Sequence, residues 1–188
     1  MSTTAREKDA IHASAPRAFP LPGTNLYRLL SDPEFKKTFH SRVKQGNRWL
    51  APLYKLRILP LLGVGKQIML LTTKGRKSNE MRDTPIGYFR VDDIVHVFSG
   101  WGKEANWYKN IMACPDEVYV QIGFRRFHAL AEIVQDPQKL KRTIERLVLQ
   151  DPRGAGYLMG WDSKLDRLEA ADFSLMIEKV LVVRFHPR

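Results

Sequence analysis

Hydrophobic positions recur at helical spacing early in the chain and at strand spacing through most of the remainder. Between roughly Asp32 and Leu56, a basic face lies opposite an apolar face made up of Phe35, Phe39, Val43, Trp49, Leu50 and Leu53, which predicts an amphipathic helical region. Six later runs have strand character: Gln67–Thr73, Met81–Arg90, Ile94–Ser99, Glu117–Gly123, Phe127–Val134 and Lys179–His186. With few helices between them, these runs predict a mainly β fold with flanking helices, either a small barrel or a strongly curved sheet of six mostly antiparallel strands.

Two helices are expected to interrupt the strands, at Lys103–Ala113 and at Pro137–Gln150. The second has leucine, isoleucine and valine on one face and alternating charges elsewhere. Asp151–Asp172 is expected to begin with a glycine-containing loop over 153–157 and to run into a third helix.

The chain is expected to form one domain behind a flexible leader. Residues 1–23 are rich in alanine, serine and threonine, and Pro16, Pro20 and Pro22 disfavour a helix there. The domain then covers 24–188: a basic amphipathic helical region (24–66), the barrel strands (67–134), helices (135–178) and the last strand (179–186).

Composition limits the class of protein and of partner. With 188 residues and 44% hydrophobic residues, the chain is long enough for one domain with a substantial core. Its net charge of +11 favours polyanionic partners: a phosphorylated or polycarboxylate ligand, nucleic acid, or an acidic lipid surface. Cys114 is the single cysteine, so no intramolecular disulfide can form, which fits a reducing cytoplasm.

No stretch has the character of a signal peptide or of a membrane-spanning helix. The longest apolar region, Trp49–Leu71, is interrupted by charges, prolines and glycines. A basic amphipathic helix that carries tryptophan and phenylalanine can lie on an anionic membrane, although such a face more often docks on the protein's own core. A cytoplasmic protein is therefore expected, with peripheral attachment to the inner face of the membrane as an alternative.

The strongest candidate for a ligand site is the loop within Leu71–Pro85. Lys74, Arg76, Lys77 and Arg82 place four cations in a short span, Gly75 frees the backbone, and Ser78 adds a hydroxyl. This pattern is typical of a cradle for phosphate or carboxylate. A solvated basic hairpin tip is the alternative, since charge runs commonly face water.

A second cluster, Ser99-Gly100-Trp101-Gly102, stands at the end of a predicted strand. Two glycines there would let a planar ligand approach the backbone, and the N–H groups of the following helix would offer hydrogen bonds. The alternative is a glycine turn followed by a helix whose Trp107 and Ile111 face the core. The chain has no GxGxxG, phosphate-loop, HExxH or GxSxG motif, and its five scattered histidines predict neither a metal site nor a catalytic triad.

Together the two clusters resemble a known family. The run TTKGRKS-x3-R-x-TP, a strand that ends in SGWG, and then NWYKNIMACP are similar in order and spacing to the deazaflavin-dependent nitroreductase and quinone reductase family, whose members use coenzyme F420. The resemblance covers about Leu70–Val134. It implies a split β-barrel fold and a reduced deazaflavin that gives a hydride to a quinone, a nitro compound or an activated alkene.

The resemblance also implies roles for particular residues. The cofactor's phosphate and acidic tail would be held by Lys74, Arg76, Lys77, Ser78 and Arg82. The ring would be lined by Thr84, Pro85 and Ile86 and would receive backbone contacts from Ser99, Gly100, Trp101 and Gly102. The groove would be closed by Trp107, Tyr108 and Asn110. Candidate donors of the proton that the product needs are Tyr88, Tyr157, Ser99 and water, although a tyrosine that packs with its hydroxyl at the surface is the commoner case.

The chain departs from the family pattern at two places near these motifs. Asn79 stands where the family loop commonly has glycine, and Gly87-Tyr88 follows the ring-contacting proline where members often carry a tyrosine. Two other functions stay open from the sequence. One is an FMN-binding oxidoreductase of the same barrel class; the other is a non-catalytic basic barrel that binds nucleic acid, which leaves SGWG and NWYKN unexplained. A second copy of the chain is a further candidate partner.

Overall fold

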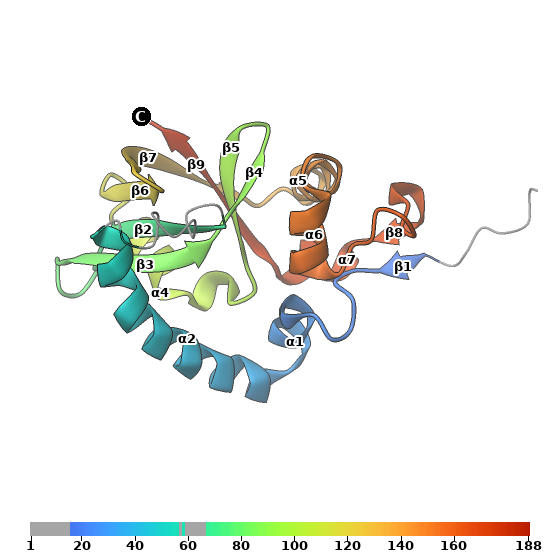
Figure 1. Ribbon diagram of the computed structural model, residues 1–188, viewed down its shortest axis with the longest axis horizontal. Helices are drawn as coiled ribbons and strands as arrows, with labels where there is room; N and C mark the ends of the chain where they lie inside the picture. Colours follow the sequence, from blue (N-terminus) through green and yellow to red (C-terminus); the bar gives the residue numbers. More distant parts are fainter. Residues whose placement is uncertain (1–15, 57, 59–66) are drawn as a thin grey trace, which may run out of the picture.

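The main element of the structure is a seven-stranded, mostly antiparallel sheet in the order β3-β2-β6-β7-β9-β5-β4 (Figure 1). The computed structural model describes residues 16–56, 58 and 67–188. The seven strands are β2 (Ile68–Lys74), β3 (Met81–Gly87), β4 (Phe89–Val91), β5 (Ile94–Ser99), β6 (Val118–Ile122), β7 (Arg125–Val134) and β9 (Leu181–Pro187). The predicted class, a mainly β fold with flanking helices, is confirmed.

The sheet curls into a half-barrel because its two edge strands are almost continuous in the chain. Tyr88 alone separates β3 from β4, yet these strands stand at opposite ends of the strand order. The sheet therefore has to bend round until its edges approach, as in a split barrel. The sequence predicts one strand over Met81–Arg90, and its division at Tyr88 accounts for the seventh strand.

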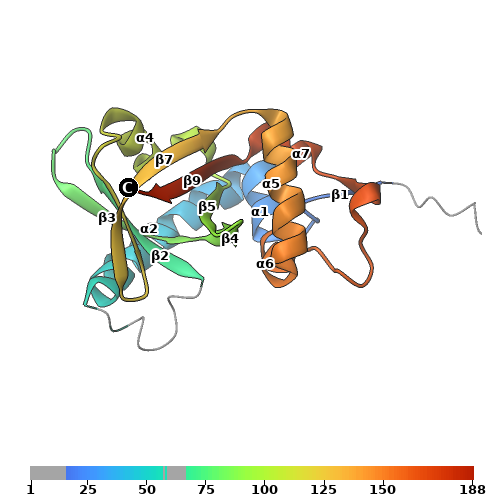
Figure 2. The same cartoon turned by 90° about the horizontal axis from the view of Figure 1, so that it is seen from above.

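Two apolar cores lie on the two faces of this sheet. The barrel interior is filled by side chains such as Leu71, Val97, Val120 and Phe185. The opposite face of β5 and β9 packs against a helical layer made of α5 (Pro137–Gln150), α6 (Pro152–Met159) and α7 (Ser174–Lys179), with α1 (Asn25–Ser31) beside α6 (Figure 2). Strand alternation explains both cores, because successive side chains of β5 point to opposite faces.

The predicted amphipathic helix is α2 (Pro33–Lys55), which runs along the outside of the barrel (Figure 1). Asp32 caps it, its carboxylate accepting a hydrogen bond from the Phe35 N–H at 2.9 Å. Near its other end, the buried Tyr54 hydroxyl donates to the Ile68 carbonyl at 2.8 Å and accepts from the Gly123 N–H at 3.1 Å. The helix therefore docks on the sheet through its C-terminal turns.

The last part of the predicted leader belongs to the fold. Arg17 and Ala18 form β1, which pairs in parallel with β8 (Ala171–Asp172). Phe19 is 1% exposed and packs against Trp161 and Phe173, with ring centroids 5.2 and 5.7 Å away. The structure thus places Arg17–Gly23 in the domain, while residues 1–15 of the predicted leader and 59–66 of the predicted helical region lie outside the described residues.

The glycine-containing loop expected at 153–157 is instead the helix α6, so this expectation was wrong. Asp151 caps the helix by accepting from the Gly154 N–H at 2.8 Å. A Cβ at Gly154 would lie 2.1 Å from the capping carboxylate, so the glycine makes room for the cap. The remaining elements are α4 (Asn106–Ala113) and the short 3-10 helices η2 (Gly102–Glu104) and η3 (Leu168–Ala170).

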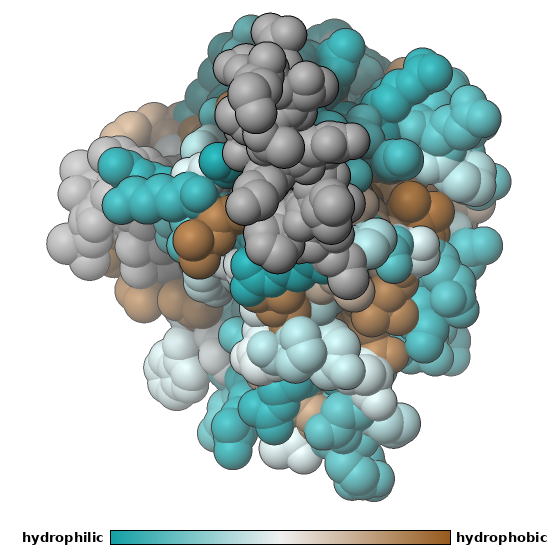
Figure 3. Space-filling model, turned by 90° about the vertical axis from the view of Figure 1, so that its right-hand side faces the viewer, coloured by the Kyte–Doolittle hydropathy of each residue, from teal (hydrophilic) through white to brown (hydrophobic). Residues whose placement is uncertain are grey.

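The end of the molecule formed by the helical layer is largely hydrophilic in the part that Figure 3 leaves uncovered by grey atoms. Hydrophobic side chains appear there as separate spots between polar ones. None of the described helices combines the length and the apolar character needed to cross a bilayer.

Candidate functional site

The predicted basic loop is the turn between β2 and β3, at one edge of the sheet. It closes through two backbone hydrogen bonds of 2.8 Å, from the Gly75 N–H to the Glu80 carbonyl and from the Asn79 N–H to the Gly75 carbonyl. A Cβ on Gly75 would lie 2.8 Å from the Ser78 hydroxyl and 3.2 Å from the Glu80 carbonyl, so a larger residue would displace the Ser78 side chain and crowd the turn. Asn79 has φ 57°, a left-handed conformation that glycine and asparagine tolerate best. The departure from the family's glycine at this position is therefore conformationally conservative.

The cationic side chains of this loop differ in whether an acidic side chain pairs with them. Arg82 pairs with Glu80 at 2.7 Å and donates to the Ser78 hydroxyl at 3.1 Å. In the described part of the chain, Lys74, Arg76 and Lys77 have no ion-pair partner. Arg76 and Lys77 are exposed, so the loop presents uncompensated positive charge to solvent.

Asn110 of α4 connects the basic loop to the segment that follows the glycine cluster. Its Oδ1 accepts from the backbone N–H of Arg76 and from the Arg76 guanidinium, each at 3.3 Å. Its Nδ2 donates to the Thr73 hydroxyl at 3.3 Å, and both of these side chains are buried. Asn106, one turn earlier, accepts from the same guanidinium at 3.5 Å. The structure therefore brings the basic loop against α4, the helix that follows the glycine cluster, although Asn106 was not among the predicted site residues.

The glycine cluster Ser99-Gly100-Trp101-Gly102 at the end of β5, called the glycine edge below, is partly covered by the N-terminal helices α1 and α2. A Cβ on Gly100 would lie 3.1 Å from Leu29 and 3.2 Å from Leu26, so this glycine accommodates α1. Trp101 stacks on Phe39 of α2, with ring centroids 5.7 Å apart and planes 18° apart. These contacts of α1 and α2 could not be predicted from the sequence, because they depend on how the helices fold back on the sheet.

Ion pairs fix α2 at both ends of this region. Lys36 pairs with Glu104 of η2 at 3.1 Å, and Lys55 pairs with Asp83 of β3 at 3.3 Å. The helix thus spans from the glycine edge to the strand that leaves the basic loop.

Two buried polar atoms at the glycine edge lack hydrogen-bond partners. Within the described residues, the Ser99 hydroxyl and the Trp101 indole N–H are the buried side-chain atoms left unsatisfied. Leaving such a group unpaired costs about 1–3 kcal/mol, so a partner from a ligand is favoured. This observation marks Ser99 and Trp101 as potential ligand contacts.

The remaining predicted cofactor residues do not share one surface. Thr84 and Ile86 are on the side of β3 that faces the barrel interior, whereas Pro85 is on the side that faces α2, because strand residues alternate. Trp107 and Tyr108 are buried in the barrel core with their rings edge to face, 6.4 Å apart. Gly102 has φ 55° and adjoins the end of α7.

The three candidate proton donors also lie in different places. Ser99 and Tyr88 are buried, and Tyr88 is part of the barrel core. Tyr157 is 81% exposed on α6, in the helical layer at the other end of the molecule from the basic loop (Figure 2). The structure therefore does not bring Tyr157 to the other two.

The curled antiparallel sheet with its flanking helices defines a protein of the split-barrel class. Lys74, Arg76 and Lys77, in the hairpin at one edge of the sheet, have no ion-pair partner among the described residues. The chain belongs to the F420H(2)-dependent quinone reductase family, whose model matches residues 59–166. It is therefore an F420-dependent oxidoreductase, and coenzyme F420 is its cofactor.

The solved structures that match the chain are distant in sequence. The F420-H2 dependent reductase FDR-A is 23% identical, with 64% of this chain and 95% of that chain covered and a TM-score of 0.42. A conserved hypothetical protein from Mycobacterium tuberculosis is 17% identical, with 66% of this chain and 76% of that chain covered and a TM-score of 0.43. General stress protein 26 from Bacillus anthracis is 16% identical, with 72% of this chain and 89% of that chain covered and a TM-score of 0.40. No curated protein matches the chain significantly, and the assignment rests on the family match.

The residues present fit this cofactor. Lys74, Arg76 and Lys77 suit a phosphate and an acidic tail, because each provides positive charge without an acidic partner among the described residues. The unpaired hydroxyl of Ser99 and indole N–H of Trp101 suit a ring that carries polar edges. A cavity of about 460 Å³ lies beside α7, and Gly102 is the predicted cofactor residue that lines it.

Proposed function

We propose that this protein reduces a quinone with reduced coenzyme F420, and that nitro compounds and activated alkenes are alternative acceptors. The bound cofactor supplies the hydride. The acceptor named by the family supports a quinone as the first choice. The protein's part is to bind and orient the cofactor and to supply a proton to the reduced product.

We propose that the basic loop binds the phosphate and acidic tail of the cofactor. The observation that carries this proposal is the contact of Asn110 with both the backbone and the guanidinium of Arg76. It ties the loop to α4 and so holds a cation without an acidic partner in a defined position. A charged hydrogen bond from such a group to phosphate contributes about 1.5–3 kcal/mol.

For the proton, the geometry favours Ser99 or Tyr88 over Tyr157. Ser99 ends β5 with a buried hydroxyl that has no hydrogen-bond partner among the described residues. A hydroxyl at hydrogen-bond distance from the product oxygen can pass on a proton. Tyr157 lies in the helical layer, exposed to water. A Tyr157→Phe variant is therefore expected to keep its kcat.

The cofactor proposal is tested by titrating F420 into the Arg76→Ala/Lys77→Ala double variant and following deazaflavin fluorescence. Affinity is expected to fall about tenfold or more, since two charged contacts are lost. An Arg153→Ala/Lys164→Ala variant, with two exposed cations removed from the other end of the molecule, is the control for net charge. Unchanged affinity in a folded loop variant would exclude this loop as the phosphate site.

The acceptor is tested with the wild-type protein and reduced F420. Initial rates are measured with a quinone, a nitroaromatic compound and an enone at equal concentrations. The quinone is expected to give the highest kcat/KM. A preference of tenfold or more for either other acceptor would replace the quinone in this proposal and leave the F420 assignment in place.

We also propose that the protein attaches peripherally to anionic membrane through α2. Trp49, Leu53 and Leu56 follow one another at i, i+4 and i+7, and Trp49 and Leu56 are 73% and 69% exposed. Co-sedimentation with phosphatidylglycerol vesicles is expected to fall in a Trp49→Ser variant. Met112→Ser, a similarly exposed apolar residue on α4, is the control, and equal losses would exclude α2 as the contact. A homodimer remains a prediction, to be tested by sedimentation.

A further inference from the structure

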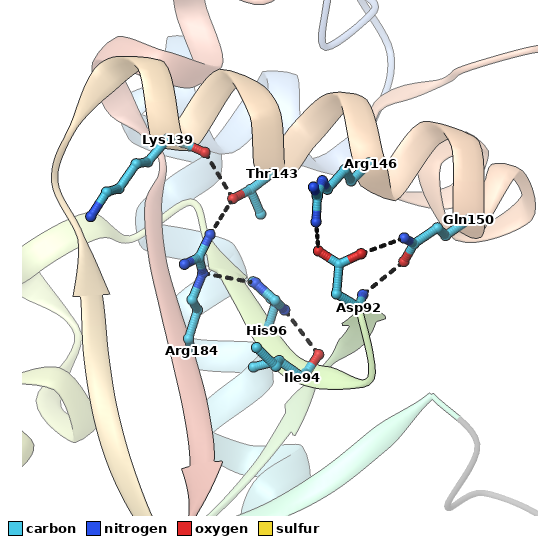
Figure 4. A network of polar contacts seen from close by, with 8 residues as sticks. All are labelled: Asp92, Ile94, His96, Lys139, Thr143, Arg146, Gln150 and Arg184. Carbon is cyan, nitrogen blue, oxygen red and sulfur yellow. Dashed lines mark hydrogen bonds and ion pairs between the residues drawn. The ribbon is translucent and has the colours of Figure 1, made fainter.

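A second group of cations faces a cavity at the other edge of the sheet. The cavity has a volume of about 230 Å³ and lies between α5 and the strands β4, β5 and β9. Lys139, Arg142 and Arg146 of α5 line it together with Arg184 of β9. Figure 4 shows Lys139, Thr143 and Arg146 along α5, next to Arg184 and His96 of the sheet.

The spacing of these residues on α5 concentrates their charge. Lys139, Arg142, Thr143 and Arg146 are at i, i+3, i+4 and i+7, so they form one stripe of the helix. The adjacent stripe, which includes Leu140, Ile144 and Leu147, is buried in the core. Docking of that apolar stripe therefore sets the cationic stripe against the edge of the sheet.

Arg184 is held in a defined orientation. His96 is buried, and its Nδ1 donates to the Ile94 carbonyl at 2.9 Å, so its Nε2 is the acceptor for the Arg184 Nε–H at 3.1 Å. The Arg184 Nη2 donates to the Thr143 hydroxyl at 2.9 Å. Glu132 of β7 forms an ion pair with the Arg184 Nη1 at 3.8 Å and so compensates part of its charge. This arrangement leaves N–H donors of the guanidinium free for a ligand and removes much of the entropy cost of orienting them.

Acidic groups compensate only part of this charge. Asp92, at the turn between β4 and β5, pairs with Arg146 and accepts from Gln150 at 2.6 Å. In the part of the chain that the structure describes, Lys139 and Arg142 have no ion-pair partner. Cations gathered around one small cavity repel one another, and an anion bound between them would relieve that repulsion.

We propose that this cavity binds a phosphate group, as a second anion site separate from the cofactor loop. Two features select phosphate: the forked guanidinium groups match its oxygens, and Arg184 is already positioned. The volume is below the roughly 300–1,000 Å³ of pockets for drug-sized ligands, so the bound group is compact. The basic loop joins β2 to β3 at the end of the molecule away from the helical layer, whereas the cavity lies against α5 of that layer (Figure 2).

The test uses pyrophosphate in isothermal titration calorimetry on the full chain. The Arg76→Gln/Lys77→Gln variant serves as the background, because the cofactor loop is itself expected to bind phosphate. Pyrophosphate binding is expected to persist in this background and to weaken about tenfold when Arg142→Gln is added. Arg153→Gln, which removes an exposed arginine of α6 outside the cavity, is expected to have no effect.

A parallel arm uses vesicles that contain phosphatidylglycerol. Binding to vesicles but not to pyrophosphate, with loss in Arg142→Gln, would support the phosphate site and identify a lipid headgroup as its source. The proposal is overturned if the loop background binds neither pyrophosphate nor the vesicles, or if Arg142→Gln and Arg153→Gln weaken the observed binding equally. Arg142 is exposed on α5, and unchanged urea unfolding of its variant shows that the fold is retained.

Discussion

Asn110 and Arg76 are 34 positions apart in the chain and are joined by two hydrogen bonds of 3.3 Å, one to the backbone and one to the guanidinium. This single amide connects the hairpin loop after β2 to the helix that follows the glycine cluster. It is the contact through which two separate sequence motifs become one candidate site.

Replacing Asn110 by alanine is expected to affect both stability and cofactor binding. The change leaves the buried Thr73 hydroxyl without its donor, at a cost of about 1–3 kcal/mol in the free energy of unfolding. It also frees the Arg76 backbone, so F420 affinity should fall several-fold. Asn106→Ala, whose contacts are 3.5 Å long and exposed, is the control and should have a smaller effect in both urea unfolding and fluorescence titration. Equal effects from both variants would contradict the role of Asn110.

The left-handed turn at Asn79 gives a prediction about backbone conformation. Asn79→Gly should retain both the free energy of unfolding and F420 affinity, since glycine adopts positive φ without strain. Asn79→Val should lose about 1–2 kcal/mol, because a β-branched side chain clashes in that conformation. Urea unfolding of the two variants measures this difference. Equal stability of Asn79→Val and the wild type would argue against the left-handed turn.

Ser99→Ala separates a structural role from a functional one. The hydroxyl has no hydrogen-bond partner in the part of the chain that the structure describes, so its removal should leave the free energy of unfolding unchanged or raise it slightly. Turnover with reduced F420 should nevertheless fall, by about 10²-fold or more if the hydroxyl donates the proton. A variant that keeps the wild-type kcat would exclude Ser99 from the chemistry. Tyr88→Phe would then be the next variant to test.

His96 predicts a pH dependence of stability. Burial, with the nearby charge of Arg184 adding to it, lowers the pKa of this histidine to about 4. The unfolded chain, with a histidine pKa near 6.5, therefore binds more protons between those values, and stability falls as the pH drops from about 6.5 to 4. The full effect is on the order of 3 kcal/mol. Urea unfolding measures the free energy of unfolding at pH 7.5 and at pH 5, and the difference between the two should be smaller in His96→Gln than in the wild type. Equal differences would show that His96 does not cause the pH dependence.

Phe19 tests whether the chain before α1 is part of the domain. Phe19→Ala should lower the free energy of unfolding by about 3–5 kcal/mol, as is typical of a buried phenylalanine. Phe124→Ala is the matched control, since Phe124 is 53% exposed in the turn between β6 and β7 and should contribute little. If Phe19→Ala lowered the free energy of unfolding as little as Phe124→Ala does, β1 and the residues around it would not contribute to the stability of the domain.

Strand pattern and turn chemistry made much of the fold predictable. Alternation of apolar and polar residues predicted the main strands. The helix predicted over Pro137–Gln150 is α5, with the same bounds in the structure. The phenylalanine at position 19 could not be assigned to the core, because its partners Trp161 and Phe173 lie more than 140 positions away. The glycines of α6 were expected to form a loop, because the capping carboxylate that requires Gly154 is a contact within the folded turn.

The sequence by itself determined the chemistry that gathers at the hairpin: local order alone places Lys74, Arg76 and Lys77 around a glycine that permits a tight turn. Only the tertiary structure decided which residues meet that loop, which glycine serves packing instead of a ligand, and that Lys139, Arg142 and Arg184 face one cavity. The physical reason is that local propensities depend on neighbours in the chain. Contacts across the sheet depend on how the half-barrel curls and on which apolar stripe each helix buries.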